Sequence, residues 1–236
     1  MGLPFFYIPG YDGVQSQIAL DEDTSKHIVQ VLRMKEGEQL KLTDGKGNVL
    51  TCGITAVSKR HCEVDVLSAV MYPESAKKIT IAISIIKNSS RFEWFLEKAT
   101  EIGVTEIIPL ICERTEKERF RHDRMKGICI SAMLQSQQCW LPLLREPEQF
   151  KNLNKWKSAT GANFIAYCIE GNKQALSHFQ ISTLSHSLIC IGPEGDFTPA
   201  EIELALQHQF IPVSLGDTRL RTETAGVVAA TLLRLV

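Results

Sequence analysis

The hydrophobic positions of the chain follow two different rhythms, and the change comes near residue 73. Before it, short β-type segments are separated by turn residues: Gln39–Thr43, Val49–Val57 and Cys62–Leu67. The first two flank Asp44–Asn48 (DGKGN), where glycine suits the positive φ of a hairpin. This rhythm predicts a small β-barrel or a curled sheet.

One short helix is predicted to pack on that sheet, over Ser25–Met34 (SKHIVQVLRM). Ile28, Val31 and Leu32 fall on one face at helical spacing. Thr24, or the aspartate before it, is available as the N-cap.

After a polar, proline-containing linker at Pro73–Lys78, strands and helices alternate. The run Ile79–Ile86 (ITIAISII) is typical of a strand buried on both faces of a parallel sheet. Further strands are predicted at Val104–Leu110, Asn163–Ile169, Ser187–Ile191 and Phe210–Leu215, and helices at Arg91–Ile102, Arg124–Leu134, Thr198–His208 and Glu223–Leu233. Gly103 is expected to end the first of these helices. The alternation predicts an open α/β sheet and a domain boundary near residue 73.

Composition places the chain among globular proteins, with 44% hydrophobic and 22% charged residues. The seven cysteines form no CxxC pair and the six histidines show no ligand spacing, so neither a disulfide framework nor a metal site is expected. A reducing cytoplasm fits this cysteine usage. No apolar run approaches the roughly 20 residues of a membrane span, and no export signal is visible.

The formal net charge of −1 argues against a protein that coats nucleic acid along its whole surface. Locally the balance differs, because residues 26–60 hold seven basic residues and three acidic ones. This excess predicts a basic patch on the N-terminal domain. A solvated surface with a chance fluctuation of charge explains it equally simply.

Three loops that follow predicted strands carry the candidate chemistry, because ligands of open α/β sheets bind at the carboxyl ends of strands. Gly192–Phe197 (GPEGDF) precedes a helix with Thr198 as its expected N-cap and Pro199 at its first position. The other two are Ser214–Gly226, which contains two arginines, and Tyr167–Gly171. None contains a dinucleotide-binding, phosphate-binding or nucleophile-elbow motif. Three unrelated structural turns remain the simpler interpretation at this point.

The same loops carry a family resemblance. IGPEGDFTPAEIELA (191–205) and SLGDTRLRTETAGVVAATLL (214–233) resemble the signature of the RsmE-type 16S ribosomal RNA uridine-N3 methyltransferases of the SPOUT superfamily. Further matches are Lys87, Arg91, Trp94, Lys98–Val104, Glu113–Thr115, Gln135–Ser136, Leu141–Pro142 and Lys26–Gly37. The resemblance covers nearly the whole chain. Two departures stand out: Asp196 replaces a common glycine, and Gln138 stands where arginine is expected.

The resemblance implies a PUA-like β-barrel that binds RNA over residues 1–72 and a SPOUT α/β domain with a deep trefoil knot over residues 73–236. It also implies S-adenosyl-L-methionine as cofactor, a homodimer, and 16S rRNA or the small ribosomal subunit as substrate. The implied cofactor residues come from the three loops: Ile169, Glu170, Gly171, Ile191, Gly192, Pro193, Glu194, Gly195, Leu215, Gly216, Leu220 and Arg221.

Catalytic roles are hypotheses built on that resemblance. Uridine N3 carries a proton at neutral pH, so a base must remove it; Glu223 is the first candidate and Glu194 the second. Arg221, or Arg219, would stabilise charge on the uracil oxygens. The expected RNA-binding residues are Lys26, Arg33, Lys35, Lys41, Lys87, Arg91, Arg114 and Gln135. For Lys87 and Arg91 a solvated helix start is the alternative.

Two other functions remain open from the sequence. The same fold could methylate a ribose 2′-hydroxyl or a guanine. The chain could also be a non-catalytic RNA-binding module, although intact Gly192, Gly195 and Gly216 argue against a degenerate pocket.

Overall fold

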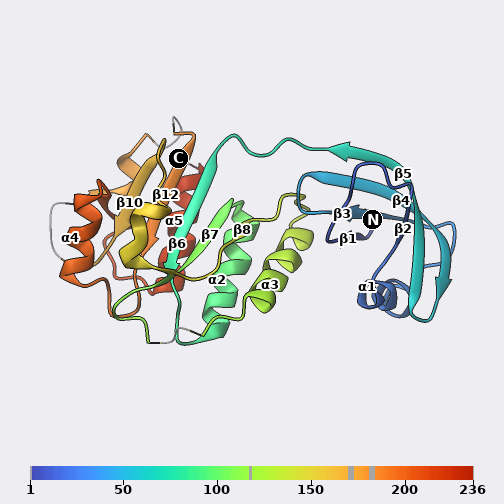
Figure 1. The fold of residues 1–236 in the computed structure, drawn as a ribbon, viewed down its shortest axis with the longest axis horizontal. Coiled ribbons are helices and arrows are strands. Elements are labelled where there is room, and N and C mark those ends of the chain that lie inside the picture. The colour runs from blue at the N-terminus through green and yellow to red at the C-terminus, as the bar shows by residue number, and fades with distance from the viewer. Residues whose placement is uncertain (1, 117–118, 170–172, 181–183, 236) are drawn as a thin grey trace. The chain divides into compact units, whose positions relative to one another are not determined.

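A computed structural model of the chain describes residues 2–116, 119–169, 173–180 and 184–235. Its contacts divide the chain into two compact units. Unit 1 comprises Met1–Glu74 and Met133–Leu141, and unit 2 comprises Ser75–Ala132 and Pro142–Val236. The ribbon in Figure 1 shows strands in both units.

Unit 1 is built on a five-stranded sheet with strand order β1-β3-β4-β5-β2. The strands are β1 (Phe5–Tyr7), β2 (Gln17–Ala19), β3 (Gln39–Thr43), β4 (Asn48–Ser58) and β5 (His61–Met71). The predicted hairpin between β3 and β4 is confirmed, with both loop glycines, Gly45 and Gly47, at positive φ. Asp44 holds this loop, since its Oδ1 accepts from the amides of Lys46 and Asn48. The core holds buried apolar side chains such as Leu40, Leu42, Leu50 and Val64.

The helix of unit 1 differs from the prediction. It starts earlier, as α1 (Glu22–Lys26) capped by Asp21, and continues as a π-helical turn over His27–Val31. The wider turn, in which the amide of Leu32 donates to the carbonyl of His27, breaks the 3.6-residue spacing. Ile28 is therefore buried, whereas Val31 and Leu32 are 68% and 42% exposed, so the expected shared face was wrong.

Unit 2 contains the predicted open sheet, with strand order β11-β13-β10-β12-β6-β7-β8 and parallel pairing throughout the strands described; β9 also pairs with β7. The strands are β6 (Lys78–Ser84), β7 (Glu106–Ile111), β8 (Leu143–Leu144), β9 (Glu148–Gln149), β10 (Ala162–Ala166), β11 (Gln174–Ala175), β12 (His186–Ile191) and β13 (Ile211–Ser214). The short strands β8, β9 and β11 were not predicted, because two residues show no periodicity.

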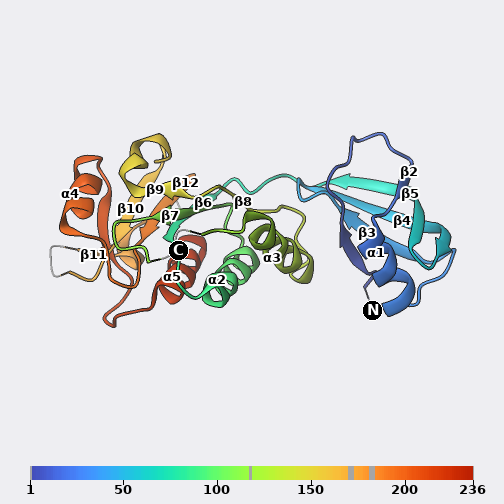
Figure 2. The same cartoon turned by 60° about the horizontal axis from the view of Figure 1, so that its bottom comes forward.

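Helices cover both faces of this sheet, as Figure 2 shows, with α2 and α5 on one side and α4 on the other. The helices are α2 (Ser89–Ile102), α3 (His122–Gln135), α4 (Pro199–Gln207) and α5 (Thr222–Leu235), with 3-10 turns at Phe150–Lys155 and Leu176–His178. Strand side chains alternate between the faces. Leu188 and Cys190 join the core under α4, while Ile83 lies against α5.

The helix ends that the sequence predicted at Thr198 and Gly103 are confirmed. Thr198 and Glu201 form a capping box at the start of α4, with Pro199 at the first helical position. Gly103 ends α2 at φ 92. These caps fix where each helix meets the loop before or after it, and the loop before α4 is part of the site described next.

Candidate functional site

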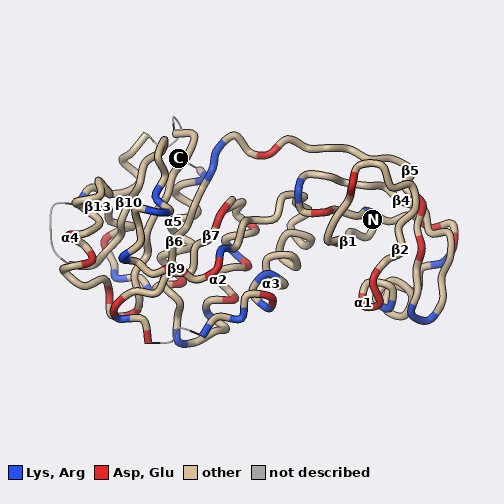
Figure 3. Tube along the Cα trace, in the orientation of Figure 1, with Lys and Arg blue, Asp and Glu red and all other residues tan. Residues whose placement is uncertain are grey.

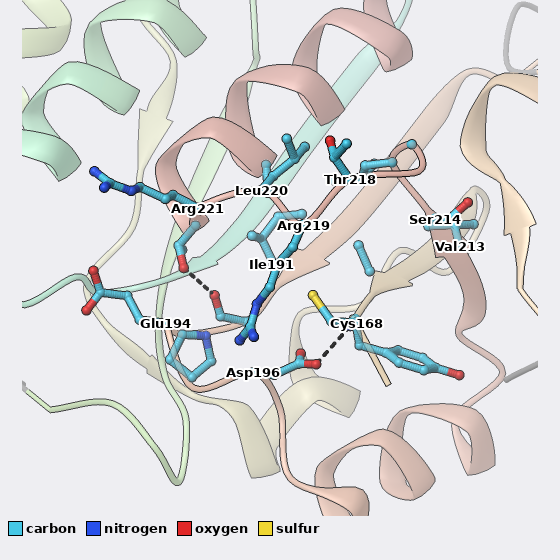
Figure 4. Close-up of a pocket in the computed structure, with 18 of the residues that line it drawn as sticks. Cys168, Ile191, Glu194, Asp196, Val213, Ser214, Thr218, Arg219, Leu220 and Arg221 are labelled. Atoms are coloured by element: carbon cyan, nitrogen blue, oxygen red, sulfur yellow. Dashed lines mark hydrogen bonds between the residues drawn. The ribbon is translucent and has the colours of Figure 1, made fainter. Parts of the chain in front are cut away.

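The three loops singled out in the sequence meet in one pocket of unit 2. They leave the carboxyl ends of β10, β12 and β13, which are neighbours in the sheet. The pocket measures about 870 Å³ and is lined by Arg91, Ala166, Tyr167, Cys168, Lys173, Ile191, Gly192, Pro193, Glu194, Asp196, Val213, Ser214, Leu215, Gly216, Asp217, Thr218, Arg219, Leu220, Arg221, Thr222 and Ala225. Figure 4 shows this wall as sticks.

The loop after β12 is tied to its surroundings through backbone atoms. The Thr222 hydroxyl donates to the carbonyl of Gly192 at 3.1 Å, which joins this loop to the start of α5. The Arg114 guanidinium donates to the carbonyl of Gly195 at 2.6 Å. A Cβ atom at Gly192 would lie 3.0 Å from the Phe197 ring, so a larger residue would crowd the turn. Two of the loop's carbonyls are therefore held in place.

Asp196 adopts a backbone conformation that glycine accommodates more easily. Its φ is 64°, in the left-handed region that favours glycine. The carboxylate compensates with two hydrogen bonds, from the backbone amide of Cys168 at 2.8 Å and from that of Phe197 at 2.9 Å. The first of these bonds, dashed in Figure 4, joins the loop after β12 to the loop after β10.

Lys173 holds the loop after β10 from another side. Its Nζ donates to the carbonyls of Tyr167 and Ile169, at 2.9 Å and 2.6 Å, and lies 4.7 Å from the centre of the Tyr167 ring. The segment 167–169 is thus bound through its carbonyls by a cation and through an amide by a carboxylate.

Arg91, on α2, lies between two carboxylates, one on the loop after β12 and one at the start of α5. Its Nη1 is 3.2 Å from Oε1 of Glu194, and its Nε is 3.6 Å from Oε1 of Glu223. Glu194 lines the pocket with a side chain 43% exposed, whereas Glu223 is buried and is not one of the lining residues. Oε2 of Glu223 is buried and has no hydrogen-bond partner among the described residues.

The two arginines of the last loop differ in orientation. In the view of Figure 4 the Arg219 side chain crosses the middle of the pocket, and the Arg221 side chain extends outward on the side of Glu194. Both side chains are exposed. The pocket therefore presents guanidinium groups and carboxylates together, a set that suits a ligand with charges of both signs.

The expected cofactor residues fall into three groups. Ile191, Gly192, Pro193, Glu194, Leu215, Gly216, Leu220 and Arg221 line the pocket. Ile169 and Gly195 are not among the lining residues, although both contribute a carbonyl to the bonds described above. Glu170 and Gly171 lie outside the described residues.

Lys173 and Arg91 are the pocket residues whose role the sequence did not indicate. Lys173 follows the glycine of its loop without any recognisable motif, and Arg91 was expected to bind RNA. Lys173 binds its own loop, whereas Arg91 contacts the loop after β12 and the start of α5.

The expected RNA-binding residues differ in how far the fold already occupies them. Lys26 is paired with Glu22, Lys87 with Glu116 and Arg114 with the carbonyl of Gly195. Arg33 and Lys35 are exposed, and Lys41 is half-buried. Gln135 is exposed at the end of α3. Figure 3 shows basic and acidic residues interspersed in both units.

Among the described residues, no three histidine, cysteine, aspartate or glutamate side chains cluster so that they could hold a metal ion. Within the same residues, no helix combines the length and the apolar character needed to cross a membrane.

Comparison with known proteins agrees with the architecture. The family model for the RNA methyltransferase domain matches residues 73–234, and that for the RNA methyltransferase PUA domain matches residues 20–67. Ribosomal RNA small subunit methyltransferase E from Rickettsia conorii is 30% identical over 98% of this chain and 94% of its own.

Two solved structures have the same fold over almost their full length. A probable rRNA methyltransferase from Porphyromonas gingivalis is 40% identical, with a TM-score of 0.90 over 98% of both chains. Ribosomal RNA small subunit methyltransferase E from Neisseria gonorrhoeae, bound to S-adenosyl methionine, is 29% identical, with a TM-score of 0.86 over 97% of this chain and 95% of that one. The chain therefore belongs to the ribosomal RNA small subunit methyltransferase E family of RNA methyltransferases.

Proposed function

We propose that this protein uses S-adenosyl-L-methionine to methylate N3 of one uridine in 16S ribosomal RNA of the small subunit. The observation that carries the proposal is the pocket formed by three strand-end loops in a chain of this family. Its volume of about 870 Å³ suits a ligand the size of a nucleoside derivative. A relative that shares its fold was crystallised with S-adenosyl methionine.

The residues present fit this cofactor. S-adenosylmethionine carries a sulfonium, an ammonium and a carboxylate, and the pocket offers carboxylates and guanidinium groups as counter-charges. The glycines at 192 and 216 allow close approach of a ligand to the backbone, and no heavy atom lies within 4 Å of a Cβ built at Gly216. When bound, the cofactor supplies an electrophilic methyl group on sulfur.

The chain's own groups would position the uracil and manage its proton. As the bond from the methyl carbon to N3 forms and the bond to sulfur breaks, the N3 proton passes to a carboxylate. Glu223 is the first candidate, supported by its buried oxygen without a described partner and by its contact with Arg91. Glu194, which lines the pocket, is the second. Arg221, or Arg219, would stabilise negative charge on the uracil oxygens.

RNA recognition is assigned to residues 1–72 as a PUA-like β-barrel, and catalysis to residues 73–236 as a knotted SPOUT domain. The match of the PUA model and the parallel sheet of unit 2 support this division. The packing of α5 against β6 and the bond from Thr222 to Gly192 support a C-terminal segment held within the earlier chain, as a knot requires.

The RNA contacts are proposed at Lys26, Arg33, Lys35, Lys41, Lys87, Arg91, Arg114 and Gln135. Arg33 and Lys35 are the best placed, because their side chains are exposed and form no ion pair with the described residues. Those that already have partners would exchange them on binding. We further propose that the enzyme acts in the cytoplasm as a homodimer, with its site near the subunit interface.

The test combines binding with product mapping. Thermal unfolding with S-adenosylmethionine at about 100 times its dissociation constant should raise the unfolding free energy by about 2.7 kcal/mol. Small-subunit RNA from a strain lacking this gene, incubated with the protein and cofactor, should then gain 3-methyluridine at one position. A 2′-O-methyl or methylguanine product would overturn the target, and RNA binding without methylation would favour a non-catalytic module.

A further inference from the structure

The backbone of the loop after β10 is hydrogen-bonded to two charged side chains, one from the loop after β12 and one from the same loop. Asp196, on the loop after β12, accepts from the amide of Cys168. Lys173 donates to the carbonyls of the residues on either side, Tyr167 and Ile169. Tyr167, Cys168 and Ile169 therefore each have one backbone group hydrogen-bonded to a charged side chain.

We propose that Asp196 is a positioning residue for the cofactor, which keeps segment 167–169 in its binding conformation while Lys173 holds the same segment by its carbonyls. The proposal deepens the proposed function, on which it rests for the identity of the ligand. It assigns a role to the position where this chain departs from its family's pattern.

The backbone at Asp196 supports a role beyond the turn itself. At φ 64° glycine would be accommodated with less strain, and it would leave the hydrogen bond from the amide of Asp196 to the carbonyl of Pro193 in place. What glycine cannot supply is the carboxylate, whose Oδ2 reaches a different loop. The strained residue is therefore explained by the contact with Cys168, which no local requirement of the turn demands.

The contact matters for binding because segment 167–169 contributes two residues, Tyr167 and Cys168, to the pocket wall. A loop that is ordered before the ligand arrives does not lose conformational freedom on binding, so affinity is higher. A hydrogen bond to a charged acceptor is strong enough to set this order.

The experiment compares wild type, Asp196→Gly and Asp196→Asn by amide hydrogen exchange, calorimetry with S-adenosylmethionine and thermal unfolding. In Asp196→Gly the amide of Cys168 should exchange at least about tenfold faster, and the cofactor should bind about tenfold more weakly. The unfolding temperature should change little, because the strain that glycine relieves at positive φ offsets the two hydrogen bonds that are lost. If Asp196 served only to stabilise the fold, its replacement by glycine would instead lower the unfolding temperature and the affinity for the cofactor together.

Asp196→Asn is the conservative variant, which should restore part of what Asp196→Gly loses. Asparagine tolerates positive φ and retains one carbonyl acceptor, so exchange and affinity should lie between those of wild type and Asp196→Gly. Lys173→Met, which keeps the apolar stem, should weaken cofactor binding with the amide of Cys168 still protected. Glu203→Gln, at an exposed site on α4, is the matched control and should change neither value.

The outcomes separate the two proposals. If wild type binds no S-adenosylmethionine, the proposed function fails, while the exchange of the Cys168 amide still decides whether Asp196 holds the loop. If the Cys168 amide exchanged at the same rate in Asp196→Gly as in wild type, Asp196 would not hold the loop. Faster exchange with undiminished affinity would overturn its role in cofactor binding.

Discussion

The Nε atom of Arg91 lies 3.6 Å from Oε1 of Glu223, which brings a cation from α2 to a buried carboxylate at the start of α5. A buried carboxylate without a counter-charge is costly, and Arg91 supplies a cation within ion-pair distance of Glu223. The pair connects the chemistry assigned to Glu223 with a helix that precedes it by more than a hundred residues.

Glu223→Gln should lower kcat by about a hundredfold or more, because the amide cannot take the N3 proton. The Kd for S-adenosylmethionine should change by less than about threefold. Single-turnover methylation and calorimetry measure the two quantities. Unchanged turnover would remove Glu223 as the base and leave Glu194, which the matching Glu194→Gln variant tests.

Arg91→Met should destabilise the protein by about 1–3 kcal/mol, since it leaves Glu223 buried and unpaired. The double variant Arg91→Met with Glu223→Gln should lose less than the sum of the two single variants, because the neutral amide needs no counter-charge. Urea unfolding of the four proteins gives the coupling energy. Strict additivity would mean that the two side chains do not interact in solution.

Gly226→Ala should destabilise the protein despite the better helix propensity of alanine. A Cβ at this site in α5 would lie 2.6 Å from the Phe95 ring and 2.8 Å from Cδ1 of Ile83. Overpacking of this kind costs about 1–3 kcal/mol. Gly127→Ala, in α3, is the control: no heavy atom lies within 4 Å of its Cβ, so stability should rise by about 0.5–1 kcal/mol. Equal effects of the two changes would contradict the packing at Gly226.

Stability should fall as the pH drops below about 6.5, in part because of His186. Burial lowers the pKa of this histidine, although the nearby carboxylate of Glu106 opposes the shift. Its ring contacts Ser158 Oγ through Nδ1 and Thr80 Oγ1 through Nε2. The unfolded chain therefore takes up a proton at higher pH than the folded chain does, and this favours unfolding in acid.

The measurement is the unfolding temperature of wild type and His186→Gln between pH 7.5 and pH 5. The wild type should lose more stability over this range than the variant, which has no proton to bind at that site. Parallel curves would show that His186 is not responsible.

RNA binding should weaken steeply with salt if the basic residues of unit 1 contact phosphates. Arg33→Ala and Lys35→Ala should each reduce the slope of log K against log salt by about one. Lys155→Ala, an exposed lysine at the end of a 3-10 turn in unit 2, should leave the slope unchanged. Equal slopes in all three variants would count against the proposed contacts.

The elements that were predictable from the sequence are those fixed by neighbours in the chain. The N-cap at Thr198, the Gly103 terminus and the hairpin at Gly45 depend on a few adjacent residues, and all three are confirmed. The π-helical turn was not predictable, because an apolar pattern read at 3.6 residues per turn places Val31 beside Ile28.

Within the site, the loops were predictable and the contacts between them were not. Strand order brings the loops after β10, β12 and β13 together, and glycine-rich turns mark two of them. The hydrogen bond from the Cys168 amide to Asp196 and the contact of Arg91 with Glu223 join residues 28 and 132 positions apart. Spacing along the chain contains no signal for either pair.

The pocket wall is built from segments spread along the chain, so the pocket is complete only late in synthesis. Segments near residues 91, 167, 192 and 220 all contribute to it. A nascent chain emerges from its N-terminal end, so a chain that has not yet exposed Arg221 lacks one wall. Cofactor binding therefore requires that synthesis has passed Arg221, and a product terminated before that residue would neither bind the methyl donor tightly nor modify RNA.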